Sequence, residues 1–150
     1  MKIVLQEVVK ASVEINEKIY SSIGKGYLLL VSFTNDDNKE IIDKMIEKVI
    51  KLRIFLDENG KTNLSLKDVD GEILSVSQFT IYADIHKGNR PSYVNCLRPD
   101  EATLLYDYFN EKIATYGFPV KTGVFGADMK VHLINDGPYT LVIDSKELGF

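Results

Sequence analysis

Three neutral polar side chains interrupt an otherwise apolar stretch of the sequence. Residues 72–83 read Glu-Ile-Leu-Ser-Val-Ser-Gln-Phe-Thr-Ile-Tyr-Ala, which has the β-branched and aromatic content of a buried strand. Ser77, Gln78 and Thr80 can form hydrogen bonds there without carrying a charge. A buried polar group without a partner costs about 1–3 kcal/mol. Either these groups bond to neighbouring backbone, which composition alone favours, or they act with backbone N–H groups on a substrate carbonyl.

Two glycine-containing stretches further along the chain are the other candidates for a site. Residues 135–138 read Asn-Asp-Gly-Pro, which is typical of a hairpin turn. If the Gly137–Pro138 bond is cis, the same stretch becomes a rigid protrusion that presents fixed carbonyls. In residues 123–129, the glycines either permit a bend or let a planar ligand approach the backbone. In the second case Phe125 and Met129 form the walls of the pocket.

The sequence lacks the common signatures of cofactor and metal chemistry. It has no P-loop, no Gly-x-Gly-x-x-Gly, no His-Glu-x-x-His and no Gly-x-Ser-x-Gly. Its single cysteine, Cys96, excludes an internal disulfide and a cysteine-based zinc site. His86 and His132 are far apart in the sequence, and His132 lies in an alternating pattern typical of an ordinary strand residue. We therefore expect no metal and no cofactor.

Hydrophobic periodicity predicts strands and two helices around these stretches. Apolar residues recur with helical spacing from Ile41 to Ile50, after an N-capping segment at residues 35–38. A second helix is expected from Pro99 to Gly117, and its predicted apolar stripe is Leu104, Leu105, Tyr108, Phe109 and Ile113. Strands are predicted at residues 2–9, 11–20 with a turn near Asn16, 27–33, 53–56, 72–83, 130–135 and 139–143.

The order of these elements indicates an α+β fold. Turns at residues 57–61 and 68–71 predict hairpins rather than crossover connections, so we expect a largely antiparallel sheet covered by two helices. The length of 150 residues predicts a single domain over residues 1–150.

Bulk composition limits the classes of partner. The hydrophobic fraction of 45% and the charged fraction of 27% are typical of a globular protein. The net charge of −4 argues against broad non-specific nucleic-acid binding, although it allows a local basic patch. We find no signal-peptide pattern and no apolar run of membrane-spanning length, so we expect a cytoplasmic protein with no membrane partner.

The candidate stretches together resemble one enzyme family. Ser77-Gln78-Phe79-Thr80 resembles the Ser-Gln-x-Thr signature of D-aminoacyl-tRNA deacylases, and residues 135–140 resemble their Asn-x-Gly-Pro-x-Thr signature. Similar matches occur in family order at residues 52–55, 87–92 and 122–129. The motifs span nearly the whole chain, and their combination is far more specific than any one of them.

The resemblance implies a fold, an activity and a partner. The fold is barrel-like, and the activity is hydrolysis of the ester between a D-amino acid and the terminal adenosine of tRNA. The enzyme is a homodimer with its active sites at the interface. The Gly137–Pro138 pair is cis, enters the partner subunit's pocket and excludes L side chains. Because glycine has no side chain, mischarged glycyl-tRNA is an expected second substrate.

The resemblance also assigns site residues. The catalytic group is Ser77, Gln78, Phe79 and Thr80, with the backbone N–H region of Phe79 acting on the ester carbonyl. The adenosine pocket is Phe125, Gly126, Ala127 and Met129. Lys87 and Arg90 are candidates for contact with the tRNA backbone. Relatives commonly have a basic residue at the position of Glu7, near the Gly-Pro loop, so this chain departs from the pattern there.

Two mechanisms and two other functions remain open at the level of sequence. Thr80 is the natural candidate for a nucleophile, but no base is visible beside it, so activation of water by the 2′-OH of the tRNA is slightly favoured. A non-enzymatic nucleic-acid-binding module that uses Lys87, Arg90 and Lys121 is one alternative function. Hydrolysis of another small D-amino-acid ester or amide is the other.

Overall fold

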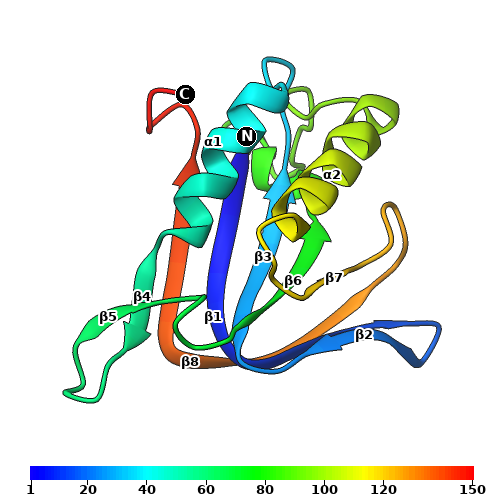
Figure 1. The fold of residues 1–150 in the computed structure, drawn as a ribbon. Helices are drawn as coiled ribbons and strands as arrows, with labels where there is room; N and C mark the ends of the chain where they lie inside the picture. Colours follow the sequence, from blue (N-terminus) through cyan, green and yellow to red (C-terminus); the bar gives the residue numbers. More distant parts are fainter.

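A computed structural model describes residues 1–137 and 139–150, and it places Pro138 only as part of a strand. Among the described residues the chain forms two α-helices, one 3-10 turn and eight strands (Figure 1). The helices are α1 (Lys39–Ile50) and α2 (Pro99–Ala114), and the 3-10 turn is η1 (Phe79–Tyr82). The strands are β1 (Lys2–Ile15), β2 (Lys18–Ile23), β3 (Gly26–Ser32), β4 (Arg53–Leu56), β5 (Thr62–Ser65), β6 (Glu72–Ser77), β7 (Val120–Thr122) and β8 (Lys130–Asp144).

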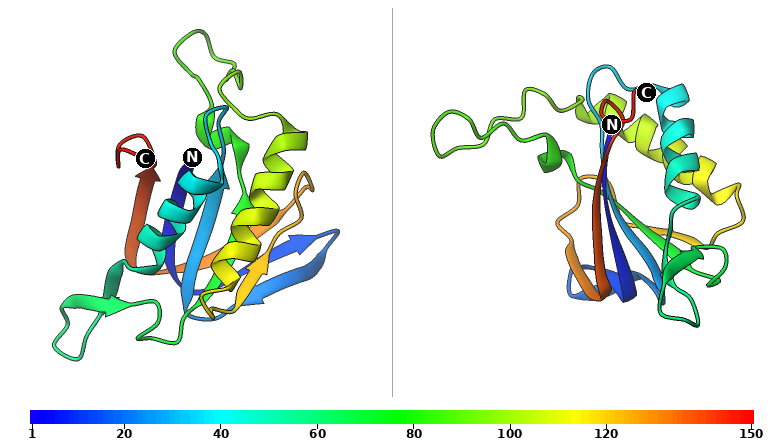
Figure 2. Two further views of the ribbon diagram at one scale, coloured as in Figure 1. Left: turned by 45° about the horizontal axis from the view of Figure 1, so that its top comes forward. Right: turned by 90° about the vertical axis from the view of Figure 1, so that its left-hand side faces the viewer.

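Both helices begin and pack as their sequences dictate. Asn38 caps α1, since its side-chain oxygen accepts a hydrogen bond from the N–H of Ile41 at 3.1 Å. Proline stands at the first position of α2, where its missing N–H costs nothing. The two helices cover the same side of the sheet (Figure 2, right). The core between helices and sheet includes Ile42 and Met45 of α1 and Phe109 of α2.

The predicted apolar stripe of α2 is wrong in part. Leu104 is 70% exposed, whereas Tyr106 is buried with Ala102, Phe109 and Ile113. These four residues follow one another at spacings of three or four, so they share one helix face. The prediction placed Leu104 on the buried face and left out Tyr106. Tyr106 can be buried because its hydroxyl has a buried hydrogen-bond partner, as described below.

The sheet mixes antiparallel and parallel pairs. Its strand order is β2-β1-β3-β6-β7, with β8 also paired to β1. β1 pairs antiparallel with β2, β3 and β8, and β4 forms a separate hairpin with β5 across the predicted turn at residues 57–61. The second predicted hairpin is wrong, because the turn before β6 leads into a parallel pairing with β3, and β7 also pairs parallel with β6. The fold remains α+β and largely antiparallel.

The sheet curls into a nearly closed barrel. β1 and β8 bend together at the bottom of the view, so their outer halves fold back over one face of the sheet (Figure 1). Ser21 of β2 donates a hydrogen bond to the carbonyl of Thr122 of β7 at 2.8 Å, which joins the two ends of the strand order. A second core of seven buried apolar residues, including Val13, Leu28 and Leu74, fills the inside. The expected barrel-like assembly is therefore confirmed.

A close backbone approach holds the parallel strands together. Gly26 pairs with Glu72 at the start of the β3–β6 ladder. A Cβ atom at Gly26 would lie 1.9 Å from the backbone oxygen of Glu72, so only glycine fits there. This contact sets where β6 begins and consequently where its carboxyl end lies. None of the described helices is long and apolar enough to cross a membrane.

Candidate active site

A cavity of about 670 Å³ opens at the carboxyl end of β6. It is lined by Val76, Ser77, Gln78, Phe79, Tyr93, Cys96, Leu97, Arg98, Pro99, Ala102, Phe125, Gly126, Ala127, Asp128, Met129 and Val131. Seven of the residues proposed from the sequence meet here, three from the end of β6 and four from the segment between β7 and β8. Ligand sites commonly lie beyond the carboxyl ends of parallel strands, and β6 is parallel to both of its neighbours.

The strand that carries the polar residues ends earlier than predicted. β6 stops at Ser77, and residues 79–82 form η1 instead of continuing the strand. The N–H of Gln78 donates to the carbonyl of Val31 at 2.8 Å, which is the last bond to β3 before the chain turns away. Ser77 and Gln78 are therefore half-buried at the cavity rather than enclosed in a sheet.

Thr80 lies outside the cavity lining. It is exposed, and its hydroxyl accepts a hydrogen bond from the side-chain amide of Gln78. The carbonyl of Phe79 accepts hydrogen bonds from two donors, the Cys96 thiol at 3.2 Å and the Ser32 hydroxyl at 3.5 Å. Burial raises the pKa of the Cys96 thiol, which keeps it in its protonated, donating form. The peptide between Phe79 and Thr80 is thus held at its carbonyl by two donors.

The fully buried polar residue of this strand is Ser75, which the sequence interpretation did not single out. Its carbonyl accepts hydrogen bonds from the Tyr106 hydroxyl at 2.8 Å and from the N–H of Gly123 at 2.9 Å. Tyr106 in turn packs against Phe125, with ring centroids 6.0 Å apart. Its helical spacing with Ala102 and Phe109 is the signal that places it on the buried face of α2.

Residues 123–129 form a tight turn that presents one wall of the cavity. The N–H of Ala127 donates to the carbonyl of Val124 at 3.1 Å, and Gly126 adopts a φ of 75°. Gly123 is buried, and a Cβ atom there would lie 2.5 Å from the sulfur of Met129. The absence of that side chain leaves room for Met129 to pack beside Gly123 and line the cavity.

Lys87 and Arg90 lie on an arm rather than in the cavity. The arm, residues 84–95, reaches away from the body, and a short antiparallel bridge between Asp84 and Ser92 closes its base (Figure 2). Both cations are exposed. The Asp84 carboxylate accepts one hydrogen bond from the backbone N–H of His86 and another from the His86 ring. These bonds, the backbone one more than the ring one, lower the pKa of the Asp84 carboxyl. Both bonds stay within residues 84–86, at the base of the arm.

Gly137 lies in a bulge, so the predicted hairpin turn at residues 135–138 is wrong. β8 runs through this stretch and stays paired with β1, where Thr140 pairs with Gln6 and Asn135 pairs with Val8. Residues 136–139 are therefore opposed by Glu7 alone. Gly137 has a φ of 107°, a conformation that favours glycine. The predicted cis bond to Pro138 lies outside the described residues.

The bulge and the cavity are separate within one chain. Gly137 does not line the cavity, although Val131, near the start of the same strand, does. The structure therefore brings Ser77, Gln78 and Phe79 together with the segment 125–129, but it does not bring Gly137 to them.

Glu7 is buried beneath the bulge. Only 5% of the residue is exposed, and its carbonyl accepts a hydrogen bond from the Asn135 amide at 3.3 Å. Its carboxylate lies 3.9 Å from the position that a Cβ atom on Gly137 would occupy. Burial, with a smaller contribution from Asp136, raises the pKa of Glu7 to about 6, while Lys25 opposes this shift.

Glu7→Gln should stabilise the protein in a pH-dependent way. Because the pKa of Glu7 is higher in the folded state, the carboxyl contributes no penalty below about pH 4.5 and its full penalty above about pH 6. Glutamine has no charge to bury, so we expect the free energy of unfolding to rise by about 1–2 kcal/mol at pH 8 and to stay unchanged at pH 4. Urea unfolding of both proteins at the two pH values measures this, with Glu111→Gln on the exposed face of α2 as a control.

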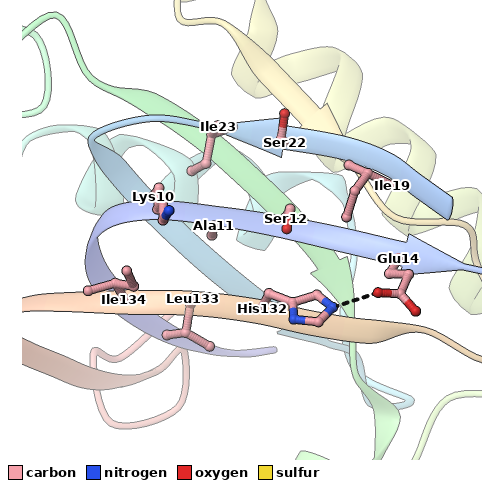
Figure 3. Close-up of a pocket in the computed structure, with 10 residues that line it drawn as sticks. All are labelled: Lys10, Ala11, Ser12, Glu14, Ile19, Ser22, Ile23, His132, Leu133 and Ile134. Carbon is pink, nitrogen blue, oxygen red and sulfur yellow. Dashed lines mark hydrogen bonds and ion pairs between the residues drawn. The ribbon is translucent and has the colours of Figure 1, made fainter. Parts of the chain in front are cut away.

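A second cavity, of about 520 Å³, contains His132 (Figure 3). It lies on one sheet face formed by β1, β2 and β8. The His132 ring bonds to the Glu14 carboxylate at 2.9 Å, and the two residues come from neighbouring strands. This cross-strand pair agrees with the interpretation of His132 as an ordinary strand residue, and the cavity contains none of the motif residues.

Residues 4–144 match the family described as D-Tyr-tRNA(Tyr) deacylase. The chain belongs to this deacylase family. The family predicted from the sequence motifs is therefore confirmed, and with it the enzyme class, since a deacylase is a hydrolase that acts on ester bonds.

Individual relatives agree with this assignment. A D-aminoacyl-tRNA deacylase of Lactobacillus acidophilus is 56% identical over 144 residues, which cover 96% of this chain and 99% of the relative. The protein of the same name from Lactobacillus helveticus is 54% identical over the same lengths.

Two solved structures share the fold of this deacylase family. One is named c-Myc DNA Unwinding Element Binding Protein; its TM-score is 0.91 at 37% identity, over 96% of this chain and 98% of that one. The other is described as a probable eukaryotic D-amino acid tRNA deacylase; its TM-score is 0.82 at 17% identity, over 95% and 97% of the two chains. At the lower identity the likeness shows the fold alone, which is the fold that the motifs predicted.

Proposed function

We propose that this protein hydrolyses the ester bond of D-aminoacyl-tRNA, releasing the D-amino acid and free tRNA as a chiral proofreading step in the cytoplasm. The observation that carries the proposal is the cavity at the end of β6, where Ser77, Gln78 and Phe79 meet the wall formed by residues 125–129. Family membership supports the reaction class. The cavity supports the placement of the substrate.

The two walls suit the two parts of the substrate. The ester lies against Ser77, Gln78 and Phe79, where the backbone N–H of Phe79 stabilises negative charge on the carbonyl oxygen. The terminal adenosine lies against Phe125, Gly126, Ala127 and Met129, since aromatic and thioether side chains suit the face of a base. The bonds from Cys96 and Ser32 to the Phe79 carbonyl hold the peptide that follows Phe79, next to the peptide that carries the Phe79 N–H.

The second half of the site comes from a second copy of the chain. Gly137 does not line the cavity of its own chain, so the proposal places the Gly137–Pro138 filter in a partner's pocket. In this homodimer the cis Gly137–Pro138 carbonyls hold the amino group of the substrate and exclude L side chains. Glycine passes such a filter, so mischarged glycyl-tRNA is a second substrate. Lys87 and Arg90 contact the tRNA backbone further from the ester.

A paired deacylation assay tests the function. The purified protein should release D-tyrosine from D-tyrosyl-tRNA and leave L-tyrosyl-tRNA intact over the same period. Equal rates on D-tyrosyl-tRNA and L-tyrosyl-tRNA would refute the chirality claim. A rate on a free D-tyrosine ester equal to that on D-tyrosyl-tRNA would favour the small-ester alternative.

Thr80→Ala should retain much of the activity. Thr80 is exposed, lies outside the cavity lining, and its hydroxyl accepts a hydrogen bond from Gln78. A hydroxyl without a base is a weak nucleophile, whereas the 2′-OH of the substrate lies beside the ester. We expect kcat to fall by less than about tenfold, the cost of one hydrogen bond. A steady-state deacylation assay measures kcat, and inactivity despite normal substrate binding would identify Thr80 as the nucleophile.

A non-enzymatic nucleic-acid-binding module is the second candidate, because one relative of high structural similarity is named for binding DNA. Binding of generic duplex DNA that weakens steeply with salt, in a protein without deacylation, would favour it. The net charge of −4 is unfavourable for such binding.

A further inference from the structure

Arg98 brings a positive charge to the cavity that no sequence motif predicted. Of the described residues that line the cavity, Arg98 is the one cation and Asp128 is the one anion. Asp128 belongs to the wall that suits the adenosine, whereas Arg98 stands immediately before α2. The remaining lining residues are apolar or neutral. An anionic group of the ligand would therefore be drawn to the side of Arg98.

The backbone of Arg98 is fixed on both sides. The N–H of the preceding residue, Leu97, donates to the carbonyl of Phe33 at 3.0 Å, and Leu97 is 8% exposed. The carbonyl of Arg98 accepts the first helical bond of α2, from Ala102, at 2.8 Å. Arg98 thus projects from the rigid start of a helix, whereas Lys87 and Arg90 lie on the projecting arm.

The guanidinium is available to a ligand. In the part of the chain that the structure describes, its ionic partner is Asp100 at 3.3 Å, and the side chains are 76% and 65% exposed. Exposed ion pairs of this kind contribute little, so the pair can separate when a stronger partner arrives. A phosphate offers paired oxygens that match the fork of the guanidinium.

We propose that Arg98 binds the phosphate that joins the terminal adenosine of the tRNA to the preceding nucleotide; this rests on the proposed function. The ester and the phosphate are attached to the same ribose, at its 3′ and 5′ positions. When the ester lies at Ser77–Phe79 and the base at residues 125–129, this phosphate is the anion nearest to the cavity. Arg98 holds this phosphate away from the reacting atoms, which makes Arg98 a substrate-binding residue.

The contact should strengthen binding without changing the chemistry. The phosphate does not react, so its interaction is equal in the ground state and the transition state. Loss of Arg98 should therefore raise KM by about tenfold on D-tyrosyl-tRNA and leave kcat unchanged, which is the pattern of one lost charge-assisted contact.

Binding of two stable substrate analogues tests the proposal independently of catalysis. The probes are 3′-deoxy-3′-(D-tyrosylamino)adenosine and its 5′-monophosphate, titrated by calorimetry into the wild type, Arg98→Gln and Lys112→Gln. Lys112 lies in the last turn of α2 and pairs with Asp43 at 3.7 Å, so it controls for loss of one charge on the same helix. Wild type and Lys112→Gln should bind the phosphorylated analogue about tenfold more tightly, and Arg98→Gln should bind both equally.

Several results would overturn the proposal. These are a wild type without preference for the phosphorylated analogue, an Arg98→Gln protein that keeps the preference, or one that loses affinity for both analogues alike. A deacylation assay on the same samples separates the two claims. If the protein prefers the phosphorylated analogue but does not hydrolyse D-tyrosyl-tRNA, the phosphate contact of Arg98 is supported and the proposed function is refuted.

Discussion

Ala127→Trp should abolish deacylation while leaving the fold intact. Ala127 lines the cavity from the tight turn that follows β7, and it is half-buried. An indole at this position occupies the space assigned to the terminal adenosine, so the ester cannot settle against Ser77–Phe79. We expect kcat/KM on D-tyrosyl-tRNA to fall by at least about 100-fold, because small misplacements of a substrate already cost that much. The free energy of unfolding should change by only about 0.5 kcal/mol, since the turn is at the surface.

The second cavity provides a matched control. Ser22 lines the cavity of Figure 3 from β2 and is exposed, so Ser22→Phe adds an aromatic ring there in a residue type that strands favour. Activity should be unchanged. If Ser22→Phe were inactive and Ala127→Trp active, the site would have to be moved to the cavity around His132 and Glu14.

Two inactive variants should restore each other's activity if the site is shared between subunits. Gly137 has a φ of 107°, which a β-branched residue cannot adopt without strain. Gly137→Val should therefore distort the bulge and lower the activity by about 100-fold. Ala127→Trp blocks the cavity and leaves the bulge untouched. In the proposed homodimer, a mixed pair would place the open cavity of one subunit against the intact bulge of the other.

The recovery has a definite size. Random exchange makes roughly half of the dimers mixed, and each mixed dimer has one intact site of two, so about a quarter of the wild-type activity should return. Differently tagged subunits and native mass spectrometry measure the exchange itself. Full exchange without any recovery would mean that each chain builds its site alone, which contradicts the shared site.

The sequence predicted the parts of the fold that depend on local pattern. α1 begins after Asn38 because the cap and the apolar spacing agree, and β4 and β5 form a hairpin because Gly60 adopts the required positive φ of 71°. The parallel pairing of β6 with β3 was missed, since it depends on the close approach at Gly26, for which the sequence shows only a glycine.

The parts of the site that follow from local sequence motifs were predicted, whereas those that depend on long-range packing were missed. The motifs pointed to Ser77–Thr80 and to residues 125–129, and the structure places all of these except Thr80 at one cavity. They gave no sign of Arg98, which reaches the cavity only because α2 begins beside it. The bulge at Gly137 looked like a turn, because a local Asn-Asp-Gly-Pro sequence cannot show that β1 continues opposite it.

The pairing of β1 with β8 ties together the two ends of the fold and sets an order for folding. β1 can pair with β3 as soon as the intervening strand β2 and β3 itself have been made, but its other edge stays open until β8 arrives more than a hundred residues later. During synthesis, that open edge of β1 is a template for any exposed strand. Such long-range pairing forms slowly, and completion of the sheet and of the bulge at Gly137 therefore comes last. A nascent chain should accordingly pair β1 with β3 early, and it should form the bulge at Gly137 only when β8 closes the sheet.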